Sequence, residues 1–115
     1  MTNDQVDAAF QAIHDALRAA QMLYMDLRDA GKDSAAATAK LCAERLQTEI
    51  DNLISKELAD WQQGAEDLIP QLSAAAQDVQ SAVEQVENDV SNAQKVVSAM
   101  ASLDEIINLA AKAVA

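Results

Sequence analysis

Apolar residues recur at alternating spacings of four and three along two long stretches of this chain, and no other feature constrains its fold as strongly. The stripe in the second half comprises Leu72, Ala76, Val79, Val83, Val86, Val90, Ala93, Val97 and Met100. The stripe in the first quarter comprises Val6, Phe10, Ile13, Leu17, Ala20, Tyr24 and Leu27. A narrow apolar seam of this period is typical of long helices that pack side by side in a bundle or coiled coil. We therefore predict an all-α protein.

Local signals mark where these helices should begin and end. Thr2 and Gln5 have the spacing of a capping box, in which each side chain satisfies a free backbone amide, so the first helix should begin at residue 3. Gly31 should end that helix, because glycine adopts the left-handed C-terminal conformation without a Cβ penalty. Ser102 and Glu105 form a second capping box, which predicts the start of a short last helix.

The stretch from Gly64 to Pro70 interrupts the helical pattern in the middle of the chain. Proline lacks the amide that an interior helical position needs, and its ring crowds the preceding turn, so a turn is the favoured interpretation. The apolar spacing nevertheless continues through Pro70, and a kinked continuous helix is the alternative. The sequence leaves this choice open.

Residues 1–115 are predicted to form a single domain, an antiparallel up-down-up three-helix bundle of long helices with a short fourth helix at its C-terminal end. The predicted helices are 3–30, 34–63, 70–101 and 103–114. A helix as short as the last one is marginal alone in water and must dock on something. The alternatives are its own bundle, a partner protein, a second copy or a lipid surface. With 25 alanines in the chain, the core should be thin and self-association favourable.

The charge of the chain is strongly negative. Nineteen acidic residues stand against eight basic ones, giving a net charge of −11. Because a phosphate backbone gains affinity from Lys and Arg, direct nucleic-acid binding is not expected. The acidic residues of the third predicted helix are interpreted as a solvated face or, alternatively, as a surface that covers a basic partner. This candidate acidic face comprises Asp78, Glu84, Glu87 and Asp89.

Residues that commonly perform catalysis are scarce. The chain has one histidine, one cysteine and two glycines, and it lacks the motifs of a phosphate-binding loop, a nucleophile elbow or a paired metal site. His14 and Cys42 fall on different predicted helices, so they are not expected to act as a nucleophile and base. We expect no enzyme activity, no metal, no cofactor and no small-molecule substrate.

The single cysteine, Cys42, cannot form an internal disulfide and points to a reducing compartment. The sequence contains no apolar run long enough to span a membrane, and its first residues do not resemble a secretory signal. We predict a cytoplasmic protein, with leaderless export as the alternative.

Two groups of apolar residues are candidates for an interface. Met22 and Met25 fall on the side of the first helix opposite its seam, and flexible methionine side chains suit an adaptable contact surface. Burial of these methionines by the last helix is the equally weighted alternative. The last helix supplies the second group, which comprises Leu103, Ile106, Ile107 and Leu109.

These observations predict a non-enzymatic protein that acts through protein–protein interaction or self-assembly. The alternative is an inhibitor, immunity or antitoxin-like protein whose acidic helix masks a basic site on a partner. A third possibility is a coat protein on an apolar granule or lipid surface, anchored by the last helix. The partners implied are another protein, a second copy of the chain, or both.

Overall fold

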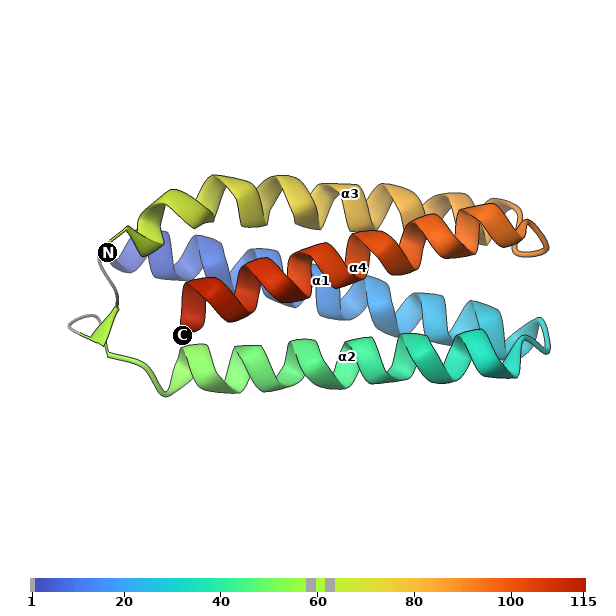
Figure 1. Ribbon diagram of the computed structural model, residues 1–115, viewed down its shortest axis with the longest axis horizontal. Coiled ribbons are helices and arrows are strands. Elements are labelled where there is room, and N and C mark those ends of the chain that lie inside the picture. The colour runs from blue at the N-terminus through green and yellow to red at the C-terminus, as the bar shows by residue number, and fades with distance from the viewer. Residues whose placement is uncertain (1, 58–59, 62–63) are drawn as a thin grey trace.

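The computed structural model describes residues 2–57, 60–61 and 64–115 and is built almost entirely of helices. Four of these helices pack together along their lengths (Figure 1). They are α1 (Asn3–Asp29), α2 (Asp33–Ile54), α3 (Ile69–Asn88) and α4 (Ala93–Val114), with a short 3₁₀ helix, η2 (Ala65–Leu68), directly before α3. The all-α prediction is confirmed, although the arrangement differs from the predicted one.

The four helices form two hairpins that lie against each other. α1 and α2 run antiparallel, as do α3 and α4, and the segment between α2 and α3 connects the hairpins at the end of the bundle where the N-terminus lies (Figure 1). α1 packs against α2 and α3, whereas α4 packs against α3 and α2. As a result, α1 and α3 are neighbours that run in the same direction. The bundle measures 46 × 21 × 17 Å.

The prediction of one helix over 70–101 and another over 103–114 is wrong, because the chain reverses at Asp89–Asn92. Asn92 caps α4, and its side-chain oxygen accepts hydrogen bonds from the amides of Gln94 at 3.1 Å and Lys95 at 3.4 Å. The Ser91 hydroxyl donates to the Asp89 carboxylate at 3.0 Å. These short polar side chains favour caps and turns, and the heptad stripe running across them concealed that signal.

The second predicted capping box, Ser102 to Glu105, lies inside α4 and starts no helix. The C-terminal part of the chain is therefore the second half of a 22-residue helix, which forms one wall of the bundle. Val97 was expected in the seam, yet it is 66% exposed. The turn at Asp89–Asn92 shifts the helical register, so the buried face of α4 begins at Val96 instead.

The predicted second helix, 34–63, is too long, because α2 ends at Ile54. Of the remaining predicted positions, 58–59 and 62–63 lie outside the described residues. Lys56 turns toward the end of α4, and Trp61 is buried among core residues. These contacts close this end of the bundle.

Between Gly64 and Pro70 the chain makes a turn, and the kinked continuous helix is excluded. Gly64 adopts a left-handed conformation with φ of 89° and precedes η2. Pro70 lies in the first turn of α3, where its missing amide has no intrahelical partner to lose.

Both signals at the ends of the first helix are confirmed. The Thr2 hydroxyl accepts from the Gln5 amide at 3.2 Å, and the Gln5 side-chain oxygen accepts from the Thr2 amide at 2.8 Å. Gly31 follows the helix with φ of 76°. The Lys32 amide then bonds to the Leu27 carbonyl at 2.9 Å, closing the last turn.

The core runs between the four helices and consists of small and branched aliphatic side chains. Its largest fully buried members are Ile13, Leu23, Leu27, Leu46, Leu72, Leu103 and Ile106. Alanines of α1, among them Ala9, Ala16 and Ala20, fill much of the remaining contact with the neighbouring helices. None of the described helices combines the length and apolar character needed to cross a membrane.

Candidate interaction surface

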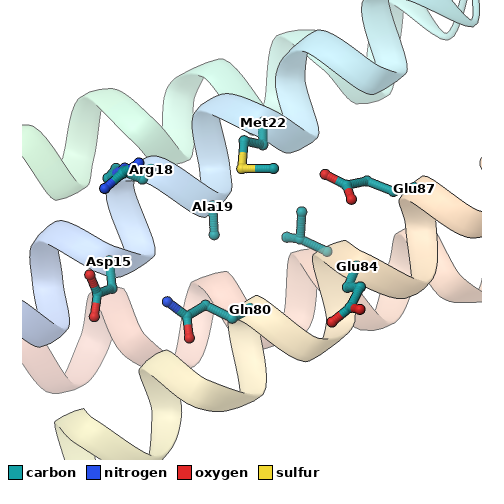
Figure 2. Close-up of a pocket in the computed structure, with 8 residues that line it drawn as sticks. Asp15, Arg18, Ala19, Met22, Gln80, Glu84 and Glu87 are labelled. Carbon is teal, nitrogen blue, oxygen red and sulfur yellow. The ribbon is translucent and has the colours of Figure 1, made fainter.

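A groove of about 430 Å³ runs between the parallel neighbours α1 and α3. Its α1 wall is formed by Asp15, Arg18, Ala19 and Met22, and its α3 wall by Gln80, Val83, Glu84 and Glu87 (Figure 2). Within each helix these residues are spaced by three or four, so they share one face. We call this feature the α1–α3 groove.

The groove exists because small side chains form its floor. Ala19 and Val83 are both buried where the two helices meet. Met22 and Glu87 rise from opposite sides, one on each helix (Figure 2). An alanine in the floor with long, flexible side chains on the rim leaves space that solvent or another side chain can fill.

The charge of the groove is predominantly negative. Three carboxylates, those of Asp15, Glu84 and Glu87, face it together with one guanidinium, that of Arg18. Ion pairs among the described residues join Arg28 to Asp29 and Lys95 to Asp89, and neither involves a groove residue. The rim carboxylates are therefore not held in ion pairs within the described part of the chain, although the Asp15 carboxylate accepts a hydrogen bond from the Gln11 side chain at 2.7 Å.

Asp26 lies one helical turn after Met22 on α1. Burial raises the pKa of its carboxyl group, and the nearby Asp29 carboxylate raises that pKa further. One carboxylate oxygen of Asp26 is buried and has no hydrogen-bond partner among the described residues. The negatively charged form of the Asp26 carboxyl group is thus disfavoured in the folded protein.

Met22 and Met25 are 48% and 49% exposed. The alternative that the last helix buries them is therefore wrong. The physical reason is the order of helices around the bundle, which places α4 mainly beside α3 and α2 and gives it little contact with α1. Met22 contributes to the groove itself, and Met25 lies one turn farther along α1.

The other candidate interface residues lie in the bundle's own core. Leu103, Ile106 and Ile107 are buried, and Leu109 is partly buried and packs against the core. Their exposure would require α4 to leave the other helices. In the folded chain, these four side chains stabilise the bundle and offer little surface to a partner.

The four candidate acidic residues do not share one face. Glu84 and Glu87 line the α1–α3 groove. Asp78 lies on the opposite flank of α3, in a groove shared with α4. Asp89 lies in the turn before α4, where its carboxylate is 3.9 Å from the Lys95 ammonium group. Their expected common face rested on a single acidic helix over 70–101, which the turn at Asp89–Asn92 divides.

Five groove residues were not predicted: Asp15, Arg18, Ala19, Gln80 and Val83. The spacing of Asp15, Arg18 and Met22 along one face of α1 was readable in the sequence. What the sequence did not show is that this face lies beside α3. That contact depends on the path of the connection between the hairpins.

A second, more apolar groove of about 540 Å³ lies between α2 and α4. Its lining includes Val97, Met100 and Ala35, and its polar residues are Ser34, Thr38 and Asp104. Val97 is 66% exposed, and Leu41, elsewhere on α2, is 59% exposed. Among the lining residues of this groove, Val97 is the exposed large apolar side chain.

The residues considered for catalysis are apart from both grooves. Cys42 is buried in α2, and burial raises the pKa of its thiol, with the Asp104 carboxylate adding to the effect. His14 stacks on Phe10 with ring centroids 5.7 Å apart. Among the described residues, no three His, Cys, Asp or Glu side chains are grouped as a metal site requires.

Comparison with known proteins finds no family model, no curated protein and no solved structure that matches this chain.

Proposed function

We propose that this protein is a non-enzymatic binding protein that acts through protein–protein contact, and that its contact surface is the α1–α3 groove together with Met22 and Met25. The observation that carries the proposal is the half exposure of these two methionines beside the groove. Large apolar side chains that remain in water and sit next to a concave surface favour association.

The chemistry of the groove supports binding better than catalysis. Its titratable groups are three carboxylates and one guanidinium. A nucleophile with an adjacent base, which most covalent mechanisms need, is not among its lining residues. An apolar floor with a charged rim is instead the usual anatomy of a surface that holds a partner.

Site-specific photo-crosslinking tests this proposal. A photoreactive amino acid is placed at position 22, at position 25 and, as a matched control, at exposed position 48 on the outer side of α2, and the producing cells are irradiated. We expect the same discrete adduct from positions 22 and 25 and not from position 48. An adduct pattern shared by all three positions, or no adduct from positions 22 and 25, contradicts the proposal.

Self-assembly is the second candidate function, and the exposed apolar side chains of the α2–α4 groove support it. Val97 is the key residue because it is 66% exposed beside Met100. With a net charge of −11, copies repel each other, so association should strengthen as salt screens the charges.

Light scattering coupled to size-exclusion chromatography at low and high salt measures this directly. We expect a mass above that of the monomer at high salt for the native chain. Val97→Glu should return it to the monomer, whereas Ser98→Glu, which adds the same charge one position away, should not. A monomer under every condition, or equal effects of both variants, contradicts self-assembly through this face.

A further inference from the structure

We infer that the α1–α3 groove receives a cationic amphipathic helix, one with an apolar stripe flanked by Lys or Arg. The inference rests on the proposed function and names the chemical class of the partner. Its basis is the juxtaposition of an apolar floor, Ala19 and Val83, with the carboxylates of Asp15, Glu84 and Glu87.

The secondary structure around the groove selects a helix over an extended peptide. Both walls are helices, whose interior amides and carbonyls are already paired within the helix. An extended strand would find no sheet edge to pair with, so its own backbone groups would have to be desolvated without partners. A helix satisfies its backbone internally and contacts the groove through side chains alone.

The dimensions of the groove fit two turns of such a helix. From Asp15 to Met22 the α1 wall spans about 10 Å at about 1.5 Å per residue. One apolar side chain of the partner can enter over Ala19 and against Met22, and basic residues one turn before and after it reach the rim. Glu84 and Glu87, three residues apart on α3, present two carboxylates to the same flank.

Charge complementarity determines that the partner should be positively charged. The groove carries three carboxylates against one guanidinium, and the whole chain carries a net charge of −11. This field attracts a cationic ligand from a distance and repels an anionic one. Binding should therefore weaken as salt rises, in contrast to association through the α2–α4 groove.

A second copy of the chain does not fit this description. A basic flank requires at least two Lys or Arg residues three or four positions apart on one helix. The closest spacing within α1, α2, α3 or α4 is five, between Lys40 and Arg45, and α3 has no basic residue at all. The occupant is therefore a different protein or peptide.

The test uses a defined probe, a synthetic helix of about 18 residues with leucine at positions spaced by three and four and lysine elsewhere, long enough to form a stable helix. Its affinity for the full chain is measured by calorimetry at low salt. Glu84→Gln with Glu87→Gln should weaken binding about tenfold. The matched pair Asp78→Asn with Glu105→Gln removes the same total charge from other exposed positions and should weaken it less than about twofold.

Met22→Ser tests the apolar part of the groove and should also weaken binding severalfold, while circular dichroism confirms that each variant remains folded. A probe with serine in place of leucine, equal in charge, should bind more weakly than the original. Equal losses from the two charge-removing pairs, or equal binding of the two probes, overturn the inference. The proposed function then still stands where positions 22 and 25 give their specific crosslinked adduct, and it falls with the inference where they give none.

Discussion

The Lys56 ammonium nitrogen lies 3.1 Å from the main-chain carbonyl oxygen of Val114. It also donates to the carbonyl of Ala115 at 3.2 Å and lies 5.5 Å from the centroid of the Trp61 ring. One cation therefore satisfies carbonyls at the C-terminal end of α4 and joins that end to the segment that connects the hairpins.

Replacing Lys56 with alanine should lower the free energy of unfolding by about 1 to 2 kcal/mol, because two hydrogen bonds to carbonyls and a cation–π contact are lost. Chemical denaturation followed by circular dichroism measures the change. Lys40→Ala is the matched control, since Lys40 is exposed on α2, and should change stability by less than about 0.5 kcal/mol. Equal effects would show that Lys56 does not hold the end of α4.

Asn92→Ala should destabilise the protein by about 1 kcal/mol, because the amides of Gln94 and Lys95 lose their side-chain acceptor. Ser102→Ala should change stability by less than about 0.5 kcal/mol, because Ser102 lies in the interior of α4. The pair distinguishes the observed helix start from the one predicted at residue 103. A larger cost at Ser102 than at Asn92 would contradict the observed position of the turn.

The sequence was most informative where a signal was local. The Thr2 capping box, the glycine after α1 and the interruption before Pro70 each depend on a few neighbouring residues, and the structure has all three. The turn at Asp89–Asn92 was equally local, but a longer apolar stripe competed with it. Val90 and Val97 match the heptad spacing of the stripe in the sequence, but they do not extend its buried seam, since Val97 is exposed.

The candidate site could be predicted only in part, because it depends on which helices are neighbours. Met22 was identified from its position opposite the apolar seam. Its neighbours Glu84 and Glu87 were identified as acidic, but nothing in the sequence placed them beside Met22. The parallel contact of α1 with α3 is a tertiary feature that helical periodicity does not encode.

Leu103→Ala should destabilise the protein by about 2 to 5 kcal/mol, because Leu103 is fully buried and its truncation leaves a cavity between the helices. Val97→Ala, on the exposed side of the same helix, should cost less than about 0.5 kcal/mol. Thermal or urea denaturation compares the two. A small effect at Leu103 would mean that α4 is not packed in the core and would restore its apolar face as an interface.

Asp26 gives the stability of the protein a defined dependence on pH. Burial, and secondarily the Asp29 carboxylate, raise its folded-state pKa above the 3.8 of an exposed aspartate. The folded protein therefore holds this proton to higher pH than the unfolded chain, and stability from this group decreases as pH rises from about 3.8 through the raised pKa.

Asp26→Asn removes the charge and should make the protein more stable than the native chain at pH 7. Near pH 3, where the native Asp26 is protonated in both states, this advantage should shrink. Urea unfolding of both proteins at the two pH values measures it, with Asp78→Asn as an exposed control of equal charge. A stability gain at Asp26 that is the same at both pH values, or no larger than that of the control, would contradict a role for the buried carboxyl group.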